Sequence, residues 1–279
     1  MNKLLTLAAS AALISGQLLI TGCSSSSDGG GTPTATVPAN AVLIDDSATA
    51  ESTMVYAVGT GITIVSAFGV ETSTPLTARD IINLVFDKVQ SNKNNAPAIA
   101  SGVDLSGQLC ITGTASGDET ETNTSYSASA TFSSCEIAPG LFFTGAITVN
   151  STFSESGTYS DTASGNLTVL FTNGSNSTTL GFNGFNYAEN GDNSTGGFTI
   201  TTFTYAIDPS TGGGFTVQLA QPLVGNNQLP CELTSGQVLV TGAAGSQARG
   251  TFNSDGSVKV EYHSGDGNFV ETDNSPLAC

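Results

Sequence analysis

Apolar and polar residues alternate through most of the chain after residue 110. Residues 126–132 place tyrosine, alanine and phenylalanine at every second position, with serine and threonine between them. This period of two is typical of an antiparallel strand with one buried face. The same period recurs over residues 143–153, 167–171, 180–187, 198–207, 215–219, 238–240 and 258–262. Turn-forming pairs such as Asn173-Gly174 and Asp255-Gly256 separate these runs, so the pattern predicts strands joined in sequence by short turns.

The alternation slips in phase at two places. Phe185 and Tyr187 have the opposite phase to Leu180 and Phe182, and a second slip separates residues 198–200 from residues 203–207. A slip beside a glycine such as Gly184 indicates a bulge or bend. We therefore predict a mainly β fold, in which one long, twisted antiparallel meander sheet curves into an open or half barrel. A sandwich of two sheets is the alternative.

The region before residue 110 contains one predicted helix and one predicted hairpin. Residues 77–93 have apolar side chains at helical spacing, including Ile81, Phe86 and Val89, and Thr77 can cap their N-terminus. The apolar stripe is broad, so we expect this helix to lie against the concave face of the sheet. Residues 54–58 and 61–68 are short β-branched runs separated by glycines, and they predict a small hairpin or an edge pair.

The N-terminus has the pattern of an export signal. Lys3 precedes an apolar segment over residues 4–20, and Thr21 and Gly22 stand directly before Cys23. This arrangement resembles the lipobox of bacterial lipoproteins. The resemblance implies that residues 1–22 are removed and that Cys23 carries a diacylglyceryl group and an N-acyl chain. An ordinary signal peptide with a coincidental cysteine is the alternative.

The residues after Cys23 predict a tether and a single domain. Residues 24–40 are rich in serine, glycine, threonine and proline and cannot bury enough surface to offset their chain entropy, so residues 23–40 should form a flexible tether. Residues 41–279 then form one β-rich domain. By resemblance to lipoprotein sorting in Gram-negative bacteria, Ser24 implies the outer membrane, with the protein anchored by lipid on either face.

The charge balance excludes one class of partner. The formal net charge is −17, with 6 Lys and Arg against 23 Asp and Glu, although only 10% of residues are charged. An acidic surface repels nucleic acid and anionic headgroups, so the membrane should be contacted through the lipid anchor and nucleic acid should not be bound.

With Cys23 assigned to lipid, an even set of four cysteines remains. An oxidising compartment favours two disulfides, and the pairing Cys110–Cys135 with Cys231–Cys279 agrees best with the spacing. The first pair brackets a polar stretch, residues 117–124, which we expect to be a loop between two strands. A structural metal is disfavoured because the chain has no C-x-x-C spacing and 1 His.

Several motifs in the second half resemble a group of β-rich, uncharacterised outer-membrane lipoproteins of Gram-negative bacteria. The resemblance rests on Phe132-Ser133-Ser134-Cys135, the segment GQVLVTG at residues 236–242, Ser246-Gln247-Ala248 and Gly265-Asp266-Gly267. It implies a fold and a location, and no established activity.

Candidate catalytic and metal-binding groups are few. His263 could take part in a catalytic triad, but no G-x-S-x-G motif accompanies it and a surface position at a strand end is favoured. Asp118, Glu119 and Glu121 are close in sequence, but we expect them in the solvated loop. Turns at residues 190–194 and 266–268 could offer oxygen ligands for weak calcium binding, although neither matches an EF-hand loop.

These observations leave two functions from different classes. The favoured one is a non-enzymatic structural or interaction module without a cofactor beyond the lipid on Cys23. The alternative is a carrier of an apolar, lipid-like ligand, held in a half barrel beneath Ile81, Phe86 and Val89. The protein partner or apolar ligand is not identified by the sequence.

Overall fold

The computed structural model describes residues 35–66, 103–104, 106–173, 176–209, 213–229, 232–275 and 277–278. The predicted signal peptide and Cys23 lie outside these residues. So do the predicted helix 77–93, with Ile81, Phe86 and Val89, and the Cys231–Cys279 pair.

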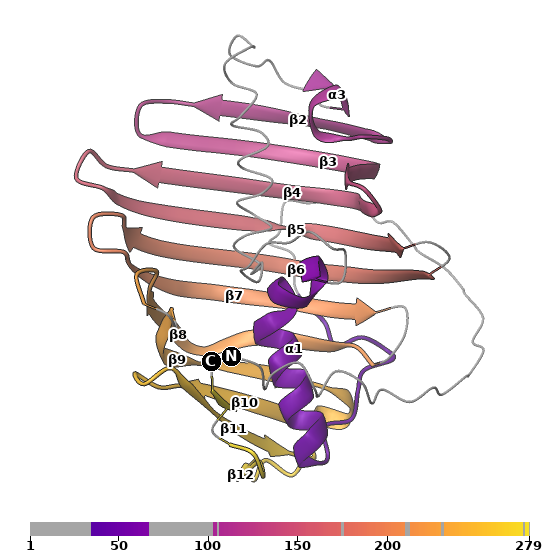
Figure 1. Cartoon of the computed structure of the whole chain (residues 1–279), viewed down its shortest axis with the longest axis vertical. Coiled ribbons are helices and arrows are strands. Elements are labelled where there is room, and N and C mark those ends of the chain that lie inside the picture. The colour runs from indigo at the N-terminus through magenta and orange to yellow at the C-terminus, as the bar shows by residue number, and fades with distance from the viewer. Residues whose placement is uncertain are drawn as a thin grey trace. The chain divides into compact units, whose positions relative to one another are not determined.

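One antiparallel sheet of 13 strands dominates the described residues (Figure 1). Its strands are β1 Val103–Asp104, β2 Thr114–Glu121, β3 Ser125–Ala138, β4 Leu141–Phe153, β5 Thr158–Asn173, β6 Asn176–Asp192, β7 Gly197–Pro209, β8 Phe215–Asn226, β9 Leu233–Thr241, β10 Gln247–Phe252, β11 Ser257–His263, β12 Val270–Glu271 and β13 Leu277–Ala278. Strands β1 to β12 lie side by side in sequence order, and β13 pairs with β11. The sheet is therefore an open meander, which confirms the predicted fold class.

Both predicted slips in phase are irregularities in the ladder. The register between β6 and β7 shifts between Asn183 and Asn186, where Gly184 has a φ of 62°. The register between β7 and β8 shifts between Ile200 and Thr204. At such a bulge one strand of the pair contains an extra residue, which bends that strand. The apolar side chains before and after the bulge then lie on the same face of the sheet.

Helix α1 spans Ser47–Ser66, where the sequence predicted a hairpin from residue 54 onward, so that prediction was wrong. Asp46 caps the helix: its Oδ1 accepts a hydrogen bond from the backbone N–H of Thr49 at 2.7 Å. Ala50, Met54 and Ala57 are buried on one face, at the spacing of successive helical turns. The cap and this packing outweigh the strand preference of the β-branched residues that follow.

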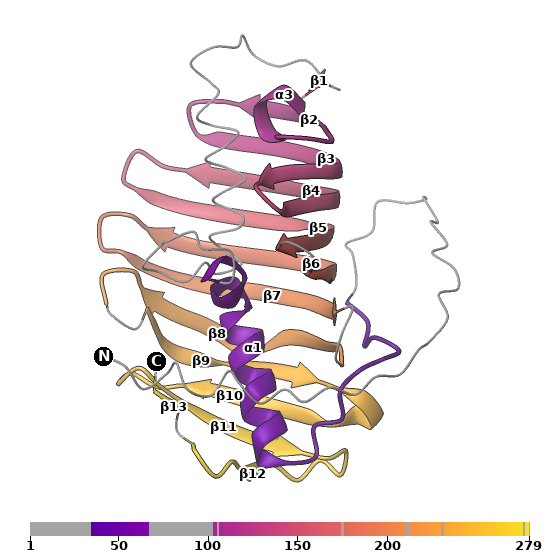
Figure 2. The ribbon, with the colours of Figure 1, turned by 45° about the vertical axis from the view of Figure 1, so that its right-hand side comes forward.

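Helix α1 packs on the C-terminal part of the sheet, where it contacts β9, β10 and β11 (Figures 1 and 2). Gly250 of β10 leaves the space that Met54 fills, because a Cβ at Gly250 would lie 2.7 Å from the Met54 sulfur. Further along the helix, Tyr205 of β7 donates its hydroxyl to the carbonyl oxygen of Ala57 at 2.7 Å. No helix in the described residues is long and apolar enough to cross a membrane.

Both ends of the described domain are fastened near α1. Val42 donates its backbone N–H to the carbonyl of Gly214 at 2.8 Å, and Ile44 donates to the hydroxyl of buried Ser246 at 2.9 Å. The Glu51 carboxylate accepts the backbone N–H and the side-chain amide of Asn274, each at 2.9 Å. The helix thereby connects the start of the domain to its C-terminal loop.

The Cys110–Cys135 disulfide is present and joins β3 to the segment between β2 and the short helix α3, Ser106–Leu109. The stretch expected to be a loop is mostly strand, because β2 continues to Glu121 and pairs with β3 as far as Tyr126. Acidic residues are tolerated near the edge of a sheet, where they also discourage pairing with another chain. The expectation of a loop over residues 117–124 was therefore wrong except at its end.

Candidate functional site

The two faces of the sheet differ in chemistry. The inner face is the one that α1 covers, and its buried side chains continue from Val260 of β11 to Tyr126 of β3. One cross-strand row of this face consists of Ala128, Val149, Ala163, Tyr187 and Phe203, so the apolar surface runs through consecutive strands. The outer face carries the residues between these positions.

The outer face of β3 to β7 is a regular array of uncharged polar side chains. The ladder registers place fifteen residues there in three rows of five, and fourteen are Ser, Thr or Asn while one is Ala. We call these fifteen residues the polar grid. The rows are Ser125–Thr152–Ser160–Asn190–Thr199, Ser127–Asn150–Thr162–Ala188–Thr202 and Ser129–Thr148–Ser164–Asn186–Thr204. Neighbouring side chains are about 4.8 Å apart across strands and about 6.8 Å apart along each strand.

The side chains of the polar grid remain accessible. None of the fifteen is buried, and five of them are exposed: Thr148, Asn150, Thr152, Thr162 and Asn190. Hydrogen bonds connect part of the middle row: Ser127 donates to Asn150 Oδ1 at 2.7 Å, and the Asn150 amide donates to the Thr162 hydroxyl at 3.5 Å. Hydroxyl and amide groups both donate and accept hydrogen bonds, so the grid can bind a ligand that offers the same groups.

The charged residues of these strands lie elsewhere. Asp161 and Glu189 are on the inner face, and Glu136, Asp192 and Asp208 are at or near strand ends. At the β2 side the grid is bordered by Asp118, which accepts a hydrogen bond from Ser129 at 3.5 Å. The grid itself therefore contains no charged group.

A polar cluster lies on the inner face of the same strands, at Glu189 of β6. Glu189 is 1% exposed, and the hydroxyls of Tyr159 and Tyr187 each donate a hydrogen bond to its carboxylate. Asp161 is directly opposite Glu189 on β5 and accepts a hydrogen bond from Ser151 of β4 at 2.5 Å. Burial of a carboxylate is costly unless hydrogen bonds compensate it, and the two tyrosines supply that compensation.

Sequence reasoning missed this cluster, although a signal for it was present. After Gly184 the inward-facing positions of the strand are Phe185, Tyr187 and Glu189. The alternation therefore predicts that the Glu189 carboxylate faces the core. Gly191 is also part of the arrangement, because a Cβ there would lie 2.3 Å from the ring of Tyr159.

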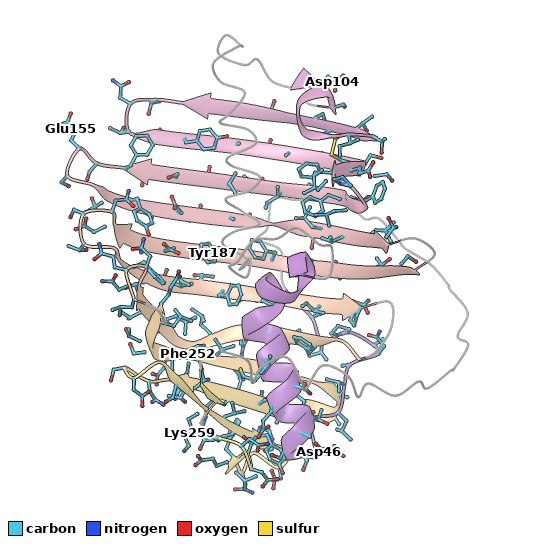
Figure 3. All side chains as sticks on the ribbon, viewed as in Figure 1. Asp46, Asp104, Glu155, Tyr187, Phe252 and Lys259 are labelled. Carbon is cyan, nitrogen blue, oxygen red and sulfur yellow. A yellow bond between two sulfur atoms is a disulfide. The ribbon has the colours of Figure 1, made fainter. Side chains whose placement is uncertain are left out.

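A charged cluster occupies the outer face at β10 and β11. It contains Arg249 and Lys259, the two Lys or Arg residues within the described part of the chain. Both contact Glu261, at 2.8 Å and 3.0 Å, and the Arg249 guanidinium lies 4.1 Å from the ring centre of Phe269. Figure 3 labels Tyr187 and Lys259, which lie in separate parts of the sheet.

The pKa of Glu261 is set by opposing effects. Burial raises the pKa of this carboxyl, but hydrogen bonds from Lys259 and Arg249 and the charges of both residues outweigh burial and lower it below its usual value. Because Glu261 lies between both cations, the cluster is a local ion-pair network within an acidic protein.

His263 has a structural setting that the sequence did not predict. It ends β11, as expected, but it is 7% exposed instead of lying on the surface. Its Nδ1 accepts the backbone N–H groups of Gly265 and Gly267 at 3.0 Å and 3.3 Å. Its Nε2 lies 3.1 Å from the side-chain oxygen of Gln247, so this ring orders the following glycine turn.

The other candidate ligands for metal or acid chemistry are dispersed. Asp118, Glu119 and Glu121 lie within strand β2 and not in a loop. Asp192 and Asp266 accept backbone N–H bonds from residues two positions later, and hydrogen bonds from Ser194 and Asn268 lower the pKa of the respective carboxyls. Within the described residues no three His, Cys, Asp or Glu side chains are grouped so that they could hold a metal ion.

Comparisons with models of protein families, with curated proteins and with solved structures found no match for this chain. The candidate site therefore rests on the geometry of the sheet and on the chemistry of its two faces.

Proposed function

We propose that this protein is a lipid-anchored, non-catalytic protein of the cell envelope, and that the polar grid is the surface by which it contacts an envelope partner. The observation that carries this proposal is the alignment of fourteen Ser, Thr and Asn side chains over five strands. A soluble surface is usually designed with about 25–35% charged side chains of both signs, so solubility does not account for a surface without any charge.

The geometry of the grid supports contact with a partner. A polar outer face is expected for an antiparallel sheet with one buried face, but Asp161 and Glu189 of these strands lie inward. The hydrogen bond from Tyr159 of β5 to Glu189 of β6 joins these two strands on the face opposite the grid, and Tyr187 of β6 donates to the same carboxylate. The array therefore lies on strands that are joined to each other by side-chain as well as backbone hydrogen bonds.

The anchor can be tested separately from the contact surface. The full-length protein with Cys23→Ser should lose acyl labelling and leave the membrane fraction as a soluble or uncleaved product. Unchanged fractionation with the membrane would refute the assignment of Cys23 as the lipidated residue. This test does not depend on the polar grid.

The contact surface can be tested in cells by site-specific photocrosslinking. A photoreactive amino acid replaces Thr148, which is exposed in the grid, or Ser254, which is exposed in the turn between β10 and β11. We expect an adduct of increased mass from position 148 and none from position 254. Equal crosslinking at both positions, or none at position 148, would contradict the proposed contact surface.

A specific observation also favours a second function, that of a carrier for an apolar ligand. The inner face of β3 to β5 combines small residues such as Ala128, Ala130 and Ala163 with Ile147 and Val149. Helix α1 makes its main contacts with β9, β10 and β11 instead. These side chains are only 3–8% exposed, so a ligand with an acyl chain would have to displace the groups that bury this apolar strip.

The carrier function is tested by native mass spectrometry with lipid extraction on the full-length protein after release from detergent. A co-purifying apolar molecule at stoichiometric amount, beyond the anchor itself, would support the carrier. Recovery of the protein without such a molecule would leave the contact module as the function that the geometry supports.

A further inference from the structure

We propose that the polar grid binds a neutral, polyhydroxylated glycan chain. This inference rests on the proposed function, since it names the class of partner that the same surface would contact.

Charge selects against most polymers. The chain has a formal net charge of −17, so polyanions such as nucleic acids and acidic polysaccharides are repelled. Arg249 and Lys259 could attract an anion, but both contact Glu261, and they lie on β10 and β11, outside the grid. The net charge of the whole protein would attract a polycation, but its cations would find no carboxylate within the grid to pair with. A partner that matches the grid is therefore uncharged.

The side chains also select against a protein partner. Protein interfaces are enriched in aromatic residues, Met and Arg at their centre, and the fifteen grid residues include none of these types. Serine and threonine hydroxyls and asparagine amides each offer donors and acceptors. A neutral glycan offers donor and acceptor hydroxyls in return, so both partners can satisfy their hydrogen bonds without burying a charge.

The repeat of the grid matches a polymer better than a single sugar. Side chains recur about every 4.8 Å across strands and about every 6.8 Å along each strand, so a flexible chain of repeated units meets an equivalent group at each step. A single hydrogen bond at an exposed position contributes little to the binding free energy, because the same group already forms a hydrogen bond to water in the free protein. Several such bonds on one chain add through effective concentration, and affinity should increase with glycan length.

Affinity electrophoresis on native gels tests this inference with the full-length protein in a polyoxyethylene detergent, which carries no sugar headgroup. Dextran, hydroxyethyl cellulose and a soluble β-1,3-glucan are the neutral probes, and alginate is the polyanionic comparator. We expect at least one neutral polymer to retard the protein, alginate not to retard it, and free glucose not to relieve the retardation.

A matched pair of variants places the binding on the grid. The triple variant Thr148→Ala, Asn150→Ala and Thr162→Ala removes adjacent side chains from the centre of the grid. The loss of several hydrogen bonds, each of modest net strength, should weaken binding by about tenfold or more. The control Gln237→Ala with Thr251→Ala removes an outer-face pair joined by a 3.1 Å hydrogen bond on β9 and β10. The control should bind like the native protein, and far-UV circular dichroism with thermal melting checks that both variants fold.

Three results would overturn the inference: no retardation by any neutral polymer, equal retardation by alginate, or equal loss of binding in the triple variant and the control. These results are distinguishable from failure of the proposed function. A photocrosslinked adduct at position 148 without glycan retardation would retain the contact surface and reject a neutral glycan as its partner. Absence of both signals would reject the grid as a contact surface.

Discussion

The packing of Met54 against β10 predicts a large effect of one substitution and its partial rescue by another. Met54 is 1% exposed and fills the space above Gly250. Met54→Ala removes the buried thioether and leaves a cavity, which should lower the free energy of unfolding by about 2–4 kcal/mol. In a domain of this size each kcal/mol shifts the melting temperature by roughly 2–4 °C, so the variant should melt roughly 4–16 °C lower.

The effect of Gly250→Ala should depend on residue 54. In the native background the new methyl group would lie 2.7 Å from the Met54 sulfur, and the resulting overpacking should cost about 1–2 kcal/mol. In the Met54→Ala background this contact is gone. The methyl group then fills part of the cavity, and the removal of glycine from a strand interior contributes a further 0.5–1 kcal/mol, approximately.

A double-mutant cycle measures this coupling. Urea unfolding followed by far-UV circular dichroism is suitable, because the chain contains no tryptophan for fluorescence. We expect Gly250→Ala to destabilise the native protein and to stabilise Met54→Ala, with a coupling energy of about 1.5–3 kcal/mol. Gly107→Ala is the control, since a Cβ at Gly107 would meet no atom within 4 Å. Additivity of the two changes to within about 0.5 kcal/mol would refute the packing of Met54 on Gly250.

Two further predictions concern acid stability and the disulfide. Burial raises the pKa of Glu51, but hydrogen bonds from Asn274 and neighbouring hydroxyls outweigh it and lower the pKa below its ordinary value of 4.5. The folded state then holds fewer protons than the unfolded state, so this stability is complete above pH 4.5 and is lost as pH falls through the folded pKa. In Asn274→Ala the free energy of unfolding should fall less steeply as the pH decreases below 4.5. The same pH dependence in the variant and the native protein would contradict this role of Asn274. Replacing Cys110 and Cys135 together with alanine should lower the free energy of unfolding by about 3 kcal/mol in the chain-entropy model, and unchanged melting would contradict that model here. Reduction adds two hydrogens for each disulfide, so the increase in mass of the native protein on reduction should also show whether the predicted Cys231–Cys279 disulfide is formed.

The sequence predicted most of the sheet because alternation is a local property. The strand at residues 126–132 shows its buried face in its own residues, and the bulge beside Gly184 is visible as a change of phase. Hairpin connections between such strands leave a sequential meander as the simplest topology. For these elements the local pattern and the tertiary packing agree.

The failures arise where distant residues decide the local structure. Residues 54–66 prefer strand by composition, but Met54 packs on Gly250, which is far away in the sequence. Residues 117–121 are acidic and glycine-containing, but they pair with β3 close to the edge of the sheet, where only the two-residue strand β1 lies beyond β2. Neither the space above Gly250 nor the edge position can be inferred before the sheet is assembled.

The polar grid was predictable only in part for a related reason. Alternation identified Ser127, Ser129 and the corresponding residues of later strands as outward-facing. Their alignment into rows depends on cross-strand register, and a period of two does not specify register. A shift of two residues keeps every side chain on its face while replacing each neighbour in a row. The candidate surface is thus a property of the assembled sheet.

The buried cluster around Glu189 supplies the register information that the alternation lacks. A shift of one residue is excluded wherever a face is buried, because it would exchange apolar and polar sides. A shift of two residues would preserve the faces, but it would move Gly191 away from Tyr159. A residue with a side chain would then lie opposite Tyr159, where a Cβ would be 2.3 Å from the tyrosine ring. It would also separate the Tyr159 hydroxyl from the Glu189 carboxylate. The inner face of β5 and β6 therefore has one register that satisfies its buried polar groups, and that register sets the rows of the polar grid on the other side.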